Sequence, residues 1–149
     1  AAAYVASQEN PDEIRQAMRR FGMDVDRLER SGALQVIDYK NLYLIRGKFS
    51  IPKTMELWKR LCDESMAKGF KGLRAAGEMA GFFEKRMVRQ LVEYEKSLHK
   101  VFELPMTAIC AYDSNVVANE RRGELYLDLI KAHGTVIIVG PDGGVVKSQ

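Results

Sequence analysis

The stretch "PMTAICAYD", Pro105 to Asp113, is the clearest strand in the sequence and decides the fold. From Met106 to Ala111 it is nearly all apolar rather than alternating, which predicts a strand covered on both faces. Strands of that kind belong to parallel sheets that lie between two layers of helices. Polar residues, Tyr112 and Asp113, follow directly, at the end of the strand where such sheets bind ligands.

On either side of this strand, short apolar runs alternate with stretches in which apolar residues recur at helical spacing. Further strands are predicted at "YVAS", "ALQVID", "GLRAAGEMA" and "TVIIVG", the last of them buried. Helices are predicted within 9–22, 23–32, 51–69, 81–102 and 121–134, and 39–50 reads as a connection. This order predicts a three-layer α/β/α fold with a mostly parallel central sheet. No linker divides the chain, so residues 1–149 are expected to form one domain.

Composition and charge narrow the class of protein. The 149 residues are 46% apolar and 29% charged, as in an ordinary globular domain. A net charge of +3 is too small to predict direct contact with nucleic acid. No apolar run approaches the roughly 18–20 residues that cross a bilayer, so no membrane contact is expected. Two cysteines are too few for a disulfide framework, which favours a reducing cytoplasm.

The familiar catalytic motifs are absent from the sequence. There is no phosphate loop, no Gly-x-Gly-x-x-Gly turn and no Gly-x-Ser-x-Gly elbow, so neither an enzyme nor a cofactor is predicted. His99 and His133 each fall near a predicted helix end, where a histidine faces the last carbonyls of the helix. Neither has a partner at metal-ligand spacing, so no metal site is predicted. "GPDGG", 140–144, is favourable turn chemistry, and "GGVVKS" after it is expected to pair back as a hairpin.

Six side chains near the carboxyl ends of the predicted strands are the candidate ligand-binding residues. They are Asp38, Tyr39, Glu78, Cys110, Tyr112 and Asp113.

Several of these candidates have a structural interpretation as well. Cys110 suits a strand core, a pocket wall or a redox or covalent role, whereas Cys62 suits the apolar face of its helix. Glu78 is either a helix cap or a ligand-facing acid, and Asp113 is either a turn and capping residue or a ligand contact.

Four segments taken in order resemble the MEDS domain, the methanogen/methylotroph DcmR sensory domain. They are "FGMDVDRLERSGALQVIDY", "GLRAAGEM", "LVEYEKSLHKVF" and "MTAICAYD", within a resemblance that runs from about Tyr4 to Val139. The resemblance implies a RecA-like α/β fold without a phosphate loop. It also implies a non-catalytic sensory domain of histidine kinases and transcriptional regulators that responds to small hydrocarbon-derived molecules. The family-pattern positions are Asp38, Tyr39, Gly77, Glu78, Met79, Tyr94, Glu95, Cys110, Tyr112 and Asp113.

Members of that family usually begin with a strand and a helix ahead of the segment that matches "YVAS". The resemblance therefore implies that this chain lacks that strand and helix, or that it is a fragment. A missing strand would expose a sheet edge, which favours a homodimer or contact with a partner output domain.

Two functions follow as expectations, with a third in reserve. The first is a sensory input domain that binds a small organic molecule in a pocket near Tyr39, Glu78 and Tyr112. The reserve is a degenerate nucleotide-binding enzyme with Glu78 as its catalytic carboxylate.

The second expected function is a dimerisation or protein-interaction module without a metabolite. It predicts filled strand ends and a large apolar surface patch. The residues expected in that patch are Tyr43, Leu44, Phe82 and Phe83.

Overall fold

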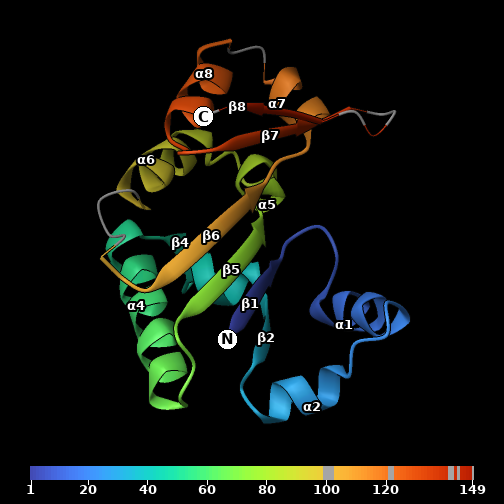
Figure 1. Cartoon of the computed structure of the whole chain (residues 1–149). Helices are drawn as coiled ribbons and strands as arrows, with labels where there is room; N and C mark the ends of the chain where they lie inside the picture. The colour runs from blue at the N-terminus through green and yellow to red at the C-terminus, as the bar shows by residue number, and fades with distance from the viewer. Residues whose placement is uncertain (99–102, 121–122, 141–142, 144, 149) are drawn as a thin grey trace.

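The fold is built on a four-stranded parallel sheet with the strand order β2-β1-β5-β6 (Figure 1). The computed structural model describes residues 1–98, 103–120, 123–140, 143 and 145–148. The sheet strands are β1 (Ala2–Ala6), β2 (Leu34–Asp38), β5 (Leu73–Glu78) and β6 (Met106–Ala111). Because β1 pairs with β2 on one side and β5 on the other, the strand order switches beside β1. Ligands of open α/β sheets bind at the carboxyl edge of such a switch point.

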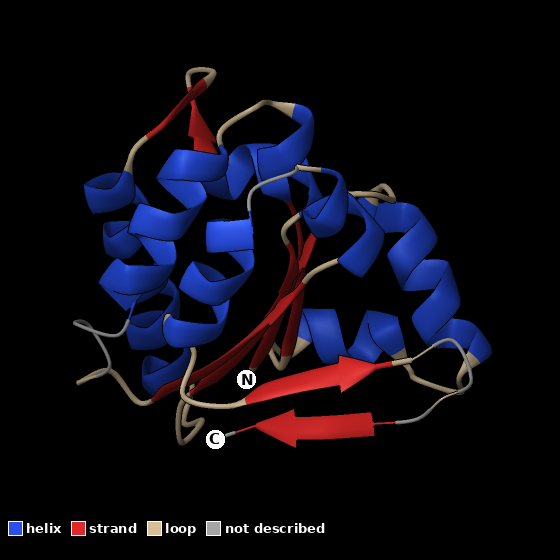
Figure 2. Cartoon of the chain, turned by 90° about the horizontal axis from the view of Figure 1, so that it is seen from above, coloured by secondary structure: helices blue, strands red, loops and turns tan. Residues whose placement is uncertain are grey.

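Helices cover both faces of this sheet, which confirms the predicted three layers (Figure 2). On one face lie α1 (Pro11–Arg20) and α2 (Val25–Arg30), whose side chains Ile14 and Val25 are buried against β1 and β2. The other face carries the larger core. It packs against α3 (Tyr39–Tyr43), α4 (Ile51–Ala67), α5 (Ala80–Glu84) and α6 (Val88–Leu98).

The last part of the chain lies beyond the carboxyl end of β6 (Figure 1). It comprises α7 (Ser114–Asn119), α8 (Gly123–Lys131), β7 (Val136–Val139) and β8 (Val145–Ser148). The predicted hairpin is confirmed, since β7 and β8 pair antiparallel from Val136 with Ser148 to Val139 with Val145. They form a sheet of their own, and most of the turn "GPDGG" lies outside the described residues.

The start of α1 has the hydrogen bonds that its capping residues predicted. Asn10 accepts hydrogen bonds from the backbone N–H groups of Asp12 and Glu13, both at 3.0 Å. The Glu13 carboxylate accepts in return from the Asn10 N–H at 3.0 Å, which completes a capping box. Pro11 occupies the first turn, where its missing N–H costs nothing.

Two strands are less buried than their sequences predicted. In β6 the residues alternate, so that Ile109 is 66% exposed while Cys110 faces the core. The reason is that α1 and α2 bury β1 and β2, and no described helix covers this face of β6. The prediction of a buried β7 was also wrong, since Val139 is 64% exposed.

Arg46 and Arg86 both have a positive φ, and near each of them the structure departs from a prediction. The connection 39–50 contains α3 and a tight hairpin of β3 (Leu44–Ile45) and β4 (Lys48–Phe49). Its turn residues Arg46 and Gly47 have φ of 53° and 75°, the positive values that a two-residue hairpin turn requires.

The helix predicted over 81–102 is divided at Arg86, whose φ is 56°. The Arg86 N–H donates to Phe83 O at 3.0 Å and the Met87 N–H to Phe82 O at 2.8 Å, the Schellman pattern that ends a helix. Glycine normally marks such an end, so the sequence carried no warning. Residues 99–102, including His99 and Phe102, lie outside the described residues.

Within the described ranges, none of the helices has the length and apolar character that a membrane span requires.

Candidate functional site

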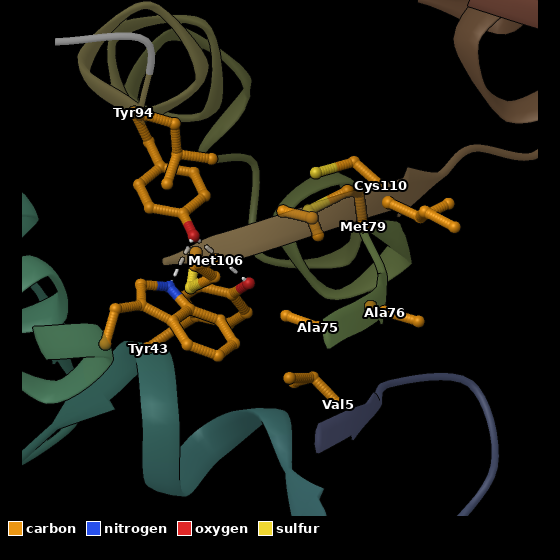
Figure 3. A pocket seen from close by; sticks show the side chains of 13 residues that line it. Val5, Tyr43, Ala75, Ala76, Met79, Tyr94, Met106 and Cys110 are labelled. Atoms are coloured by element: carbon orange, nitrogen blue, oxygen red, sulfur yellow. Dashed lines mark hydrogen bonds between the residues drawn. The ribbon is translucent and has the colours of Figure 1, made fainter. Parts of the chain in front are cut away.

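A small cavity of about 10 Å³ lies between the sheet and the helices of the larger core (Figure 3). Ala75 and Gly77 on β5 and Ala108 on β6 form its floor, and their lack of bulk leaves the space above the strands. A cavity of this size holds about one water molecule. Larger side chains close it, namely Tyr43, Trp58, Met79, Tyr94, Leu98, Met106 and Cys110.

The polar groups of the cavity are three aromatic side chains that hydrogen-bond with one another. Trp58 Nε1 donates to the Tyr94 hydroxyl at 2.8 Å, and the Tyr43 hydroxyl lies 3.5 Å from the same oxygen (Figure 3). Burial raises the pKa of both the Tyr43 and the Tyr94 phenol above its ordinary value. Both hydroxyls are therefore neutral and available as donors or acceptors.

Next to this cavity, a second polar cluster surrounds Glu95 on α6, which is only 1% exposed. The Tyr112 hydroxyl donates to Glu95 Oε1 at 2.5 Å, and the Cys110 thiol lies 3.6 Å from Oε2. Burial, and then the nearby Glu95 charge, raises the pKa of Cys110 and of Tyr112 well above the ordinary values. Cys110 is therefore held as a thiol, which is the opposite of what a reactive cysteine needs.

His133, just after α8, completes this cluster. Its Nδ1 lies 2.6 Å from Leu129 O, which confirms the prediction that it faces the last carbonyls of its helix. Its Nε2 lies 3.4 Å from Glu95 Oε2. That nitrogen is buried and has no hydrogen-bond partner among the described residues.

Glu78 holds the loop that follows β1. Its Oε2 accepts from the backbone N–H groups of Ser7 at 3.0 Å and Gln8 at 2.8 Å, and its Oε1 accepts from the Tyr4 hydroxyl at 2.7 Å. Burial and the bond to Glu78 raise the pKa of Tyr4, so the phenol stays a donor. Glu78 thus holds the loop between β1 and α1 from the neighbouring strand β5, while the helix that follows Glu78, α5, has no side-chain cap.

Three of the six predicted site residues have structural contacts. Asp38 caps α3 by accepting from the Lys40 N–H at 2.7 Å, and Asp113 caps α7 by accepting from the Asn115 N–H at 2.8 Å. Tyr39 is buried, with its ring against Gly81.

The structure brings together two of the six, Cys110 and Tyr112, which meet at Glu95. Cys110 also lines the cavity, whereas Tyr39, Glu78 and Tyr112 are not among its lining residues. The apolar surface patch expected around Tyr43, Phe82 and Phe83 is contradicted, because all three side chains are buried in the core.

Reasoning from residue patterns assigned no function to Trp58, Tyr94, Glu95 or His133. A signal for Glu95 was present, since it lies within the buried stripe of α6 that also contains Leu91 and Leu98. A carboxylate on an apolar stripe indicates a buried polar contact. No comparable signal marked the contact of His133 with Glu95, because these two residues are distant in sequence.

Comparison with known proteins gives one family. The family model MEDS, described as the methanogen/methylotroph, DcmR sensory domain, matches residues 1–133. A search of curated proteins found no match.

Proposed function

Since the chain belongs to the MEDS family of sensory domains, we propose that it is a non-catalytic input domain that binds a small organic molecule in the cavity beside Trp58 and Tyr94. MEDS is a sensory rather than a catalytic family. In this proposal, the bound molecule changes how the domain contacts the output part of a signalling or transcription-regulatory protein.

The observation that carries the proposal is the chemistry of the cavity. Its walls are apolar or aromatic, and its polar groups are the hydroxyls of Tyr43 and Tyr94 beside the Trp58 N–H. Small-molecule sites commonly combine a mostly apolar lining with a few placed polar groups. The complementary ligand is a compact molecule with an apolar body and one hydrogen-bonding group.

Size is the second constraint on the ligand. A cavity of about 10 Å³ admits a guest larger than water only if the lining moves. Met79 and Met106 both line it, and methionine changes rotamer more readily than other core residues. The proposal therefore favours molecules of very few heavy atoms, with the methionines giving way around them.

Trp58 provides the test, because it is the only tryptophan in the chain and it lines the cavity. Its fluorescence is to be followed while the chain is titrated with methanol, ethanol, 1-propanol and 1-butanol, and with the corresponding amines and chlorides. We expect a saturable change for the smallest compounds and a loss of response above a limiting size.

A pair of variants on β6 supplies the control. Ala108→Val fills the cavity and should abolish the response, whereas Ala111→Val, on an exposed part of the same strand, should retain it. A wild-type chain that responds to none of the compounds, or an equal response from both variants, would contradict the proposal.

A second candidate function, dimerisation, rests on exposed apolar side chains at the last strands. Within the described residues β6 pairs with β5 alone, so its other edge is available to extend the sheet. We propose a second copy as the occupant, because an edge strand can pair with itself across a two-fold axis. The exposed side chains are Ile109, Ile137, Ile138, Val139 and Val145.

Sedimentation velocity over a concentration series tests this second candidate. Ile109→Lys should shift the chain towards monomer, and Phe21→Lys, which also changes an exposed apolar residue but lies after α1, should not. A wild-type chain that stays monomeric at every concentration would rule the dimer out.

A further inference from the structure

We propose that Glu95, Cys110 and His133 bind a divalent transition-metal ion of the zinc class. This inference goes beyond the proposed function and does not depend on it. The three residues come from α6, from β6 and from the segment after α8, and their ligand atoms all lie within 4.8 Å of one another.

The donor atoms define the class of metal. Sulfur, imidazole nitrogen and carboxylate oxygen together are the ligands of Zn²⁺ and of its spectroscopic substitute Co²⁺. Cys110, a thiol in the metal-free chain, would bind such an ion as a thiolate and release its proton to solvent. Mg²⁺ and Ca²⁺ prefer oxygen ligands and are not served by a thiol and an imidazole.

The distances fit a tetrahedral ion. Bonds of about 2.0–2.1 Å to nitrogen and oxygen and about 2.3 Å to sulfur place tetrahedral N and O ligands about 3.4 Å apart, and S and O ligands about 3.5 Å apart. In the structure His133 Nε2 lies 3.4 Å from Glu95 Oε2, and Cys110 Sγ lies 3.6 Å from the same oxygen. Two of the three edges of the ligand triangle are therefore already at metal-binding length.

The orientation of His133 also points to a cation. The 2.6 Å contact between Nδ1 and Leu129 O requires a proton on Nδ1, so in the neutral ring Nε2 carries a lone pair. That buried lone pair faces a carboxylate oxygen at 3.4 Å and has no hydrogen-bond partner among the described residues. Two facing lone pairs repel, and a metal ion between them turns that repulsion into two bonds. A backbone carbonyl on the second ring nitrogen is the usual support for a metal-binding histidine.

The two carboxylate oxygens of Glu95 have different contacts, as is common for a carboxylate that binds a metal ion. Oε1 accepts the hydrogen bond of the Tyr112 hydroxyl, whereas Oε2 faces both Cys110 and His133. Tyr112 thus fixes the carboxylate through Oε1, as supporting groups do in metal sites, and Oε2 is the oxygen that lies near both other ligands. Three protein ligands leave one position of a tetrahedral ion for water or another small ligand.

The test is a titration of the metal-free, reduced chain with Co²⁺, followed by absorption spectroscopy. We expect visible bands of tetrahedral cobalt and a thiolate-to-cobalt charge-transfer band that saturate at one ion per chain and are displaced by Zn²⁺. Cys110→Ser should remove the charge-transfer band. Cys62→Ser is the matched control, because Cys62 is buried elsewhere in the core and should leave both bands unchanged.

The other two ligands are tested by affinity. Glu95→Gln and His133→Gln should each weaken Co²⁺ binding by at least about tenfold, the lower end of what even a supporting residue contributes. Circular dichroism checks that each variant is folded, and Cys110→Ser, the mildest change, keeps the test valid if Glu95→Gln does not fold. A wild-type chain without stoichiometric cobalt bands, or bands that survive Cys110→Ser, would overturn the proposal.

Discussion

Tyr94 is the residue on which the polar groups of the main core depend. Its hydroxyl accepts the hydrogen bond of Trp58 Nε1 at 2.8 Å and lies 3.5 Å from the Tyr43 hydroxyl, and all three side chains are buried. A buried donor that loses its acceptor keeps the full cost of its desolvation. The single phenol oxygen therefore stabilises more than its own side chain.

Replacing that oxygen alone should be measurable. Tyr94→Phe keeps the ring and removes the acceptor of the Trp58 N–H, so we expect the free energy of unfolding to fall by about 1–3 kcal/mol. Urea unfolding followed by Trp58 fluorescence gives the value. Tyr126→Phe, at a partly exposed position on α8, should change it by less than about 0.5 kcal/mol. Equal stability of the two variants would show that the Trp58 bond contributes little.

For single residues, the sequence indicated roles that depend on neighbouring residues. It did not indicate contacts between residues that are far apart in the chain. Asp38 and Asp113 cap helices that begin at the very next residue, so their neighbours alone indicated that role. Glu95 and His133 meet across a separation that only the folded chain closes. Cys110 was left with three interpretations for the same reason, since its partner Glu95 lies on another element.

Among the elements, the close approach of α5 to α3 and to the loop after β1 depends on one glycine. A Cβ atom on Gly81 would lie 2.6 Å from the Tyr39 ring and 2.9 Å from Ser7 Oγ. The Gly81 N–H also donates to Ser7 Oγ at 2.7 Å. The first turn of α5 therefore fits against these groups only without a side chain.

Adding one methyl group should separate these elements. We expect Gly81→Ala to destabilise the chain by about 1–3 kcal/mol, the usual cost of overpacking a filled core. Gly134→Ala is the control, because nothing lies within 4 Å of the position its Cβ would take. Differential scanning calorimetry of both variants compares the costs, and a Gly81→Ala chain as stable as Gly134→Ala would contradict this account of the packing.

Apolar periodicity predicted the succession of the sheet strands and main helices along the chain. It did not predict which faces of the strands would be covered by helices. "TAICA" is apolar at nearly every position, which conceals the alternation between buried Cys110 and exposed Ile109. Whether the face of β6 that carries Ile109 is covered depends on where α1 and α2 pack. The residue pattern of β6 does not indicate where these helices pack. Positive φ at Arg46 and Arg86 was equally hidden, because arginine rarely adopts it.

For the molecule as a whole, the larger core contains a cluster of four aromatic rings that contact one another. Tyr43, Phe49, Phe82 and Tyr94 lie with ring centroids between 5.0 and 6.2 Å apart. Such pairs add to the stability that burial alone provides. The two tyrosines among them are also buried acids, which links the stability of the whole chain to pH.

That link predicts a loss of stability in alkali. In the unfolded chain Tyr43 and Tyr94 ionise near their ordinary pKa of about 10. In the folded chain burial holds both pKa values higher. Their contribution is therefore fully present below about pH 10 and is lost as the pH rises further. Urea unfolding at about pH 8 and about pH 10.5 measures the loss, and Tyr43→Phe should reduce it. A loss of the same size in that variant would assign the effect to other groups.

The contact between Glu78 and the loop after β1 has a consequence for competition between anions. Two successive backbone amides, those of Ser7 and Gln8, already share one oxygen of a carboxylate that belongs to the same chain. Successive backbone N–H groups that point to one side can form anion-binding sites. An external phosphate would have to displace the Glu78 carboxylate. The chain holds this carboxylate beside the amides, so its effective concentration there far exceeds that of a free solute. While these two hydrogen bonds are made, the Glu78 carboxylate occupies both amides, so any external anion must compete with it.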